Sequence, residues 1–140
     1  MFLLLFPALV QAEPIKWLSY KDGLKKAKAE NKKIFLNFRA DWWTFCKKME
    51  AESFNQAEIV KFLNTNFISI RVDVDKEKKI ASTYHVRSLP VSWFLEPNGE
   101  RITSIPGYVN PELFLIILKY ISSGSYKTLT LMEFKKQSTK

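Results

Sequence analysis

Cysteine and histidine are almost absent from this sequence. Its 140 residues contain one cysteine, Cys46, and one histidine, His85. One cysteine cannot form an internal disulfide bond, and these two side chains are fewer than the ligands that a structural zinc ion needs. A serine or cysteine catalytic triad would have to use His85, and its neighbours indicate no such arrangement. The sequence therefore predicts no internal disulfide, no metal site and no cofactor, and we expect His85 at the surface.

Arginine, glycine and proline are also scarce. Lysine supplies 18 of the 22 basic side chains and arginine only four, although the formal net charge is +8. Proteins that read nucleic acids usually carry clustered arginines, whereas these lysines are scattered along stretches with helical spacing. We interpret the charge as a solvated basic surface that attracts acidic partners, with no nucleic acid among them. The 4 glycines and 6 prolines exclude collagen-like and linker-like chains.

The N-terminal segment differs from the rest of the chain. Residues 1–12 read MFLLLFPALVQA and end in the small-x-small pattern Val10-Gln11-Ala12, which is typical of signal-peptide cleavage. The run is shorter than the roughly 20 residues that span a bilayer as a helix. We expect a short, truncated signal peptide at 1–12, a single domain at 13–140, and a periplasmic or secreted location. The alternative is a buried first strand or helix, which Pro7 and the lack of polar alternation disfavour.

Hydrophobic periodicity predicts an alternation of strands and helices from residue 15 onward. Ser19, Asn55, Asp75, Asn110 and Thr130 have the residue types that cap helices. Strands are expected at 15–17, 33–38, 66–74, 91–96 and 101–105, and the turn at 97–100 joins the last two as a hairpin. This order predicts an α/β fold with a mixed sheet and helices on both faces, followed by a short final helix.

Short motifs in a fixed order carry a resemblance to a known family. They are Phe38-Arg39-Ala40-Asp41-Trp42, Cys46-Lys47-Lys48-Met49-Glu50, Asn66-Phe67, Val72-Asp73-Val74-Asp75, Tyr84-x-Val86, Leu89-Pro90, Phe94-Leu95-x-x-Asn98-Gly99, Gly107-Tyr108 and Pro111-Glu112-x-Phe114-Leu115. The series resembles the thioredoxin superfamily, in particular exported thioredoxin-like proteins and the C-terminal domain of DsbD-type disulfide interchange proteins. It covers residues 17–134 and implies a thioredoxin-like fold with an added C-terminal helix.

One motif departs from the family pattern. The resemblance implies Trp-Cys-x-x-Cys, and this chain has Trp42-Trp43-Thr44-Phe45-Cys46, so Trp43 stands at the attacking cysteine and Cys46 at the resolving one. An indole cannot form the mixed disulfide that begins the dithiol cycle. The family's buried aspartate is replaced by Asn37, and a carboxamide cannot act as a base. The resemblance thus implies a thiol–disulfide oxidoreductase family protein with a degenerate active site, and whether it is an enzyme stays open.

The remaining chemistry leaves several alternatives. Cys46 is either a lone reactive thiol or a buried small hydrophobe, and the second is the commoner behaviour of free cysteine. Trp43 could also be a variant of an active parent, because cysteine and tryptophan codons differ by one base. The implied partners are protein or peptide thiols and disulfides, together with a membrane electron-donor protein. The oligomeric state is open.

A second function is a redox-inactive binding module. The resemblance implies a cis peptide bond at Leu89-Pro90, beside which the backbone pairs with an extended substrate by strand addition. This needs no sulfur. Trp42, Trp43, Leu89 and Pro90 are the predicted substrate-binding residues, and we expect Trp42 to pack on the scaffold while Trp43 stays exposed.

Overall fold

The computed structural model describes residues 2–5 and 13–139, so most of the expected signal peptide at 1–12 lies outside the described residues. The strands are β1 (Trp17–Leu18), β2 (Lys33–Arg39), β3 (Phe67–Asp73), β4 (Val91–Leu95) and β5 (Arg101–Pro106). The helices are α1 (Tyr20–Glu30), α2 (Thr44–Glu52), α3 (Ala57–Asn66), α4 (Lys78–Thr83), α5 (Pro111–Ser122) and α6 (Leu131–Ser138), with a 3-10 turn at Ser125–Lys127.

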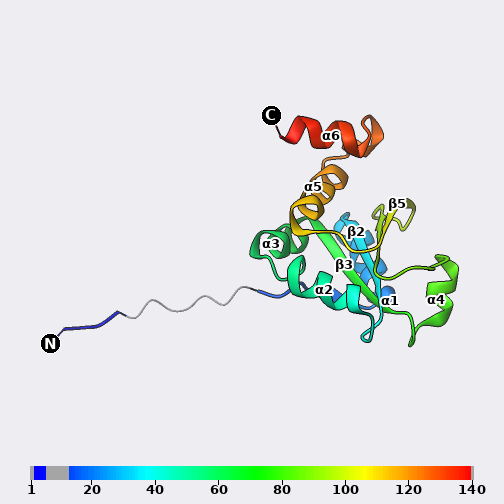
Figure 1. The fold of residues 1–140 in the computed structure, drawn as a ribbon, viewed down its shortest axis with the longest axis horizontal. Helices are drawn as coiled ribbons and strands as arrows, with labels where there is room; N and C mark the ends of the chain where they lie inside the picture. The colour runs from blue at the N-terminus through cyan, green and yellow to red at the C-terminus, as the bar shows by residue number, and fades with distance from the viewer. Residues whose placement is uncertain (1, 6–12, 140) are drawn as a thin grey trace.

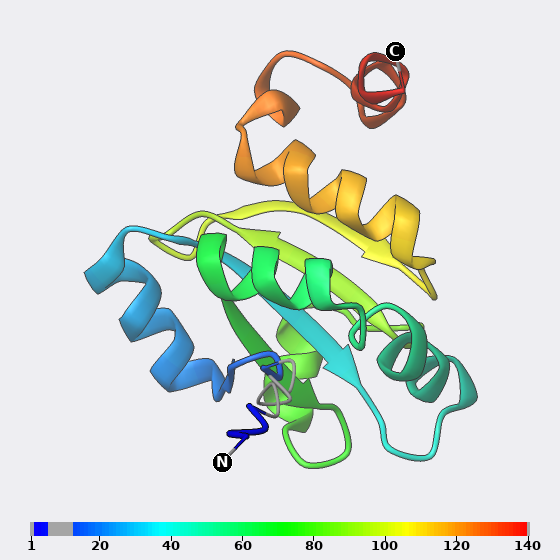
Figure 2. The same cartoon turned by 90° about the vertical axis from the view of Figure 1, so that its left-hand side faces the viewer.

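The described strands form one mixed sheet in the order β1-β3-β2-β4-β5 (Figure 1). β2 runs parallel to β3 and antiparallel to β4, and β5 is the hairpin partner of β4. Helices α2, α3 and α5 contribute to the core on one face, whereas α1 and α4 pack on the other. The expected thioredoxin-like α/β fold with helices on both faces is confirmed. Helix α6 lies beyond α5, on the side away from the sheet (Figure 2).

Phe35 on β2 is the centre of the larger core. Its ring lies 5.4–5.9 Å from the rings of Trp17, Phe54, Phe94 and Phe114. Neighbouring residues on a strand point to opposite faces, so Ile34 and Leu36 enter the core on the other side. A strand that is apolar on both faces must lie inside the sheet, which is the position β2 occupies.

The strand register places three loops at one edge of the sheet. Arg39, at the end of β2, is paired with Asp73 at the end of β3, and Phe38 is paired with Val91 at the start of β4. The segments that follow β2 and β3 and the segment that precedes β4 therefore meet at this edge. The N–H of Gly107, just after β5, donates to the Pro90 carbonyl over 2.7 Å and joins a fourth segment to them.

Helix caps were predicted well where the side chain itself accepts a hydrogen bond. Ser19 and Asn110 cap α1 and α5, and Thr130 forms a full capping box with Glu133. Two expected caps are wrong. Helices α3 and α4 begin after Gln56 and Glu77, not after Asn55 and Asp75, and neither of those residues makes a side-chain capping bond.

Close packing of α1 on the sheet gives a first prediction. A Cβ added at Gly23 would lie 2.2 Å from Cγ1 of Ile70 and 2.4 Å from its Cδ1. Gly→Ala inside a helix usually stabilises it, but here we expect Gly23→Ala to lower the free energy of unfolding by about 1–3 kcal/mol through overpacking. Urea denaturation measures the change.

The matched control is a double-mutant cycle with Ile70→Ala, which removes both clashing carbons. The cost of Gly23→Ala should shrink in that background. An equal cost in both backgrounds would show that the contact with Ile70 is not its cause.

Candidate functional site

The turn between β2 and α2 positions the degenerate motif. The Trp43 N–H donates to the Ala40 carbonyl over 3.3 Å, and the Trp43 carbonyl accepts from the N–H groups of Cys46 and Lys47 at 3.1 and 3.2 Å. These bonds make Trp43 the N-cap of α2. An indole cannot accept a hydrogen bond as a serine or aspartate cap does, so α2 begins without a side-chain cap.

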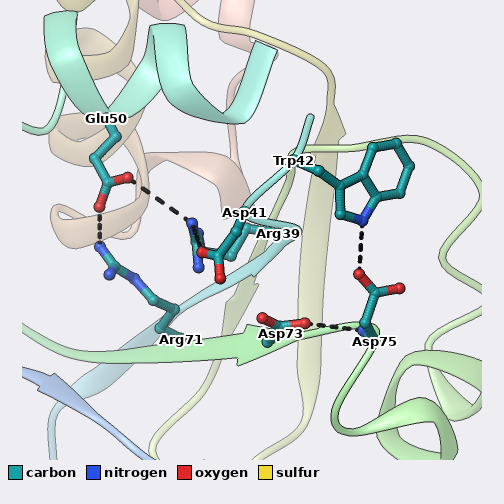
Figure 3. Close-up of polar contacts among 7 residues, drawn as sticks. All are labelled: Arg39, Asp41, Trp42, Glu50, Arg71, Asp73 and Asp75. Carbon is teal, nitrogen blue, oxygen red and sulfur yellow. Dashed lines mark hydrogen bonds and ion pairs between the residues drawn. The ribbon is translucent and has the colours of Figure 1, made fainter. Parts of the chain in front are cut away.

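Trp42 is fixed by the turn that follows β3. Its indole Nε1 donates to Oδ2 of Asp75 over 2.7 Å, and Asp75 is itself held by its N–H, which donates to Oδ1 of Asp73 over 2.9 Å (Figure 3). The expectation that Trp42 packs on the scaffold is wrong, because only the edge of its indole is anchored and 62% of the residue stays exposed.

Three exposed aromatic side chains cluster at this turn, and we call Trp42, Trp43 and Phe45 the aromatic surface. Trp43 and Phe45 are 39% and 49% exposed. The rings of Trp42 and Trp43 lie 5.5 Å apart at 81°, and those of Trp43 and Phe45 lie 6.3 Å apart at 56°. Contiguous apolar surface of this kind marks binding sites in soluble proteins.

Cys46 lies on the inner side of the same helical turn. It is only 4% exposed. Burial raises the pKa of the Cys46 thiol, so at neutral pH the group is a protonated thiol with little access to a reagent. Of the two alternatives for this residue, the geometry favours the buried small hydrophobe.

No base lies under the motif on β2. Asn37 is fully buried, and neither its amide nitrogen nor its amide oxygen has a hydrogen-bond partner among the described residues. Its register neighbour Ser92 on β4 is also buried, with an unpartnered Oγ. A neutral amide in this place has polar atoms but cannot take up a proton from a thiol.

Ion pairs hold α2 against the sheet (Figure 3). Glu50 on α2 accepts from Arg71 on β3 over 2.9 Å and lies 3.9 Å from Arg39 on β2. Arg39 also pairs with Asp41, and this hydrogen bond lowers the pKa of the Asp41 carboxyl. Sequence reasoning missed this network, because its members are up to 32 residues apart, from Arg39 to Arg71. The signal available was the parallel pairing of β2 with β3, which sets Arg71 opposite Asn37, two residues before Arg39.

The Leu89-Pro90 bend lies at the same edge of the sheet. Its peptide bond is cis, Pro90 is buried and Leu89 is half-buried. The structure thus brings the turn that carries Trp42, Trp43 and Cys46 to the edge where β4 begins. His85 is exposed, with a left-handed φ of 51°. In the part of the chain that the structure describes, no group of three or more His, Cys, Asp or Glu side chains is placed to hold a metal ion.

A family profile described as a thioredoxin-like domain matches residues 20–122. The chain belongs to the thioredoxin-like family. Thioredoxin-1 of Drosophila yakuba is 30% identical over 95 residues, which are 68% of this chain and 85% of that protein. The thiol:disulfide interchange protein DsbD of Vibrio cholerae is 29% identical over 101 residues, or 68% of this chain and 17% of DsbD.

Another relative is much longer. Spermatogenesis-associated protein 20 of Rattus norvegicus is 38% identical over 72 residues, which are 51% of this chain and only 9% of that protein. The family match ends at residue 122, so α6 lies outside it.

Solved structures agree on the fold. A thioredoxin from Thermus thermophilus superposes with a TM-score of 0.71 at 21% identity, covering 78% of this chain and 88% of that one. The DsbH oxidoreductase superposes with a TM-score of 0.71 at 20% identity over 92% and 96% of the two chains. The described helices include none that is long and apolar enough to cross a membrane.

The burial of Cys46 gives a second prediction. With the native protein, a thiol reagent should modify Cys46 roughly ten times more slowly, or slower still, than an exposed thiol, because both access and the thiolate fraction are reduced. Modification should accelerate as the pH rises, since the raised pKa moves thiolate formation to higher pH.

The matched control is Lys47→Cys in a Cys46→Ser background, which places an exposed thiol on the next residue. Mass spectrometry follows both reactions at the same pH. Equal rates in the two proteins would contradict the burial argument and favour a reactive Cys46.

Proposed function

We propose that this chain binds extended polypeptide segments at the edge formed by the aromatic surface and the Leu89-Pro90 bend, without running a dithiol cycle. The observation that carries the proposal is a contrast within one helical turn. The aromatic surface stays open to solvent, whereas the only sulfur of the motif is 4% exposed. A partner can therefore contact apolar side chains and backbone hydrogen-bonding groups at this site, but no exposed nucleophile.

The dithiol cycle lacks its first step. Disulfide exchange begins when a thiolate attacks a substrate disulfide. Trp43 has no sulfur, and burial raises the pKa of the Cys46 thiol that remains. Asn37 cannot accept the proton that a buried thiol must lose. Each of these departures removes a different requirement of the same reaction, so the loss does not rest on one residue.

The backbone before Pro90 is suited to strand addition. Among the described residues, the N–H and C=O groups of Ser88 and Leu89 take part in no backbone hydrogen bond. The Pro90 carbonyl is already used by Gly107, and proline has no N–H. An extended segment would therefore pair with the backbone of Ser88 and Leu89 while its side chains contact the neighbouring aromatic rings.

Single-cysteine chemistry at Cys46 is the second candidate. Cys46 lies in the first turn of α2, where unpaired N–H groups favour a thiolate, and its partners would be protein thiols, disulfides or a membrane electron-donor protein. Burial opposes this effect and is the larger influence on the pKa of Cys46. We further propose an exported location, for which the pattern at residues 10–12 is the support.

Peptide binding gives a third prediction. Trp43→Ala should weaken the binding of an unfolded, cysteine-free polypeptide roughly five- to tenfold, because an exposed aromatic anchor is lost. Cys46→Ser should leave the affinity unchanged. Met132→Ala is the matched control, since Met132 is an exposed apolar side chain on the distant helix α6. Fluorescence anisotropy of the labelled polypeptide measures all three. Loss of binding in Cys46→Ser would instead favour covalent chemistry.

Restoring the sulfur gives a fourth prediction. With dithiothreitol as the reductant, the unaltered chain should not accelerate insulin reduction above the rate with dithiothreitol alone. Trp43→Cys should accelerate it measurably, because it recreates two thiols one helical turn apart, which dithiothreitol returns to the reduced form after each turnover. Adding Asn37→Asp should raise the rate further by restoring a base. Thr44→Cys serves as the control, since it adds a thiol at the wrong spacing. Repeated turnover by the unaltered chain would overturn the proposed function.

A further inference from the structure

We propose that the aromatic surface prefers a polypeptide segment that carries an arginine or lysine side chain. The positive charge of that side chain would lie against the indole rings of Trp42 and Trp43 and be attracted by the nearby carboxylates. This inference rests on the proposed function and adds the chemical class of its substrate. It is opposite in sign to what the net charge of +8 suggests, namely acidic partners.

The first observation concerns how this protein uses its tryptophans. The guanidinium of Arg71 lies 4.3 Å from the Trp17 ring, and that of Arg101 lies 5.3 Å from the Trp93 ring. Within the described ranges, no lysine or arginine lies over Trp42 or Trp43, although both are exposed. Trp17 and Trp93 thus already have cation partners inside the fold, whereas Trp42 and Trp43 have none among the described residues.

The second observation is ring geometry. The planes of Trp42 and Trp43 are 81° apart and their centroids 5.5 Å apart. A cation is attracted by an aromatic face from within about 6 Å of the ring centroid, and tryptophan is the strongest such ring. Because the Nε1–H of Trp42 donates a hydrogen bond to the Asp75 carboxylate, the electron density of that indole's face increases.

The third observation is local charge (Figure 3). Asp41 and Asp75 are exposed and Asp73 is half-buried at this edge of the sheet. Arg39 pairs with Asp41 and Glu50, and Arg71 pairs with Glu50, so these two arginines already have carboxylate partners within the fold. The Asp41 side chain is 70% exposed and that of its partner Arg39 is 13% exposed, so this carboxylate faces solvent more fully than its guanidinium partner.

Two features of the protein disfavour the binding of a cation at this surface. Lys47, Lys76 and Arg87 are exposed near the aromatic surface and the Leu89-Pro90 bend, and the N-terminus of α2 has the positive end of the helix dipole. These act at a distance through solvent and are screened by salt. A cation on an indole face makes direct contact, so its effect should persist at moderate ionic strength.

The test uses the full chain and short labelled peptides that differ only at one central residue: arginine, lysine, norleucine or glutamate. Fluorescence anisotropy should give an affinity for the arginine peptide roughly fivefold higher than for the norleucine peptide. Lysine should fall between them, since a planar guanidinium stacks better than an ammonium. The glutamate peptide should bind most weakly.

Variants locate the preference. Trp42→Leu and Trp43→Leu should each reduce the advantage of arginine over norleucine. Asp75→Asn keeps an acceptor for Trp42 and removes only the charge, so it should reduce that advantage about twofold. Glu58→Gln is the matched control, because it removes an exposed carboxylate from α3 and should change nothing.

The outcomes separate the two proposals. If norleucine binds as well as arginine or better, the cation preference is wrong and the peptide-binding function stands. Tightest binding of the glutamate peptide would also overturn the preference and assign the surface to acidic segments. If no peptide binds and circular dichroism shows a folded protein, the proposed function fails, and the preference fails with it.

Discussion

The first turn of α2 places one side chain of the motif in solvent and another in the core, and the site depends on this difference in exposure. Trp43 is the N-cap, where the chain enters the helix from outside, and Cys46 is one turn further along, on the side that faces the sheet. The same geometry gives a dithiol protein one accessible and one protected sulfur. With tryptophan at the outer position, it gives an exposed ring above a protected thiol. The helical turn places the two side chains in the same way, and the outer one is an indole in place of a thiol.

The sheet explains why the proposed binding surface does not depend on a sulfur at position 43. The bend before β4 is brought to α2 by the register of β2 with β4, and the Asp75 anchor of Trp42 is brought there by the register of β2 with β3. Neither pairing involves Cys46. The ion pairs of Glu50 with Arg39 and Arg71 also fix α2 through groups other than the motif. The interactions that position α2 and the Leu89-Pro90 bend are therefore separate from the residues of the motif that would carry out chemistry.

The fold was largely predictable from the sequence, and the site was so only in part. Patterns such as β2 and the Asn110 cap are local, so periodicity and residue type were sufficient to identify them. The position of Trp42 was not predicted, because its partner Asp75 is 33 residues away and has the residue type of a helix cap. The start of α4 was misplaced for the same reason: Asp75 was expected to cap a helix, and its carboxylate instead accepts from an indole. Where a polar side chain has two possible partners, only the tertiary structure decides between them.

Asn37 supports the proposal that this site transfers no proton. A carboxylate buried at this position would carry a desolvation cost, which proton transfer to and from a thiol could justify. An amide has nearly the same shape and no charge. Its two unpartnered atoms and the unpartnered Oγ of Ser92 still make the spot polar, so the substitution keeps the volume and polarity of the site and removes its titration. Asn37 is a neutral amide in the interior, where the dithiol reaction needs a base. Trp43 is an indole at the surface, where that reaction needs a thiolate. Neither feature removes the Leu89-Pro90 bend or the aromatic surface, which is why we propose binding, and not exchange, as the function of this chain.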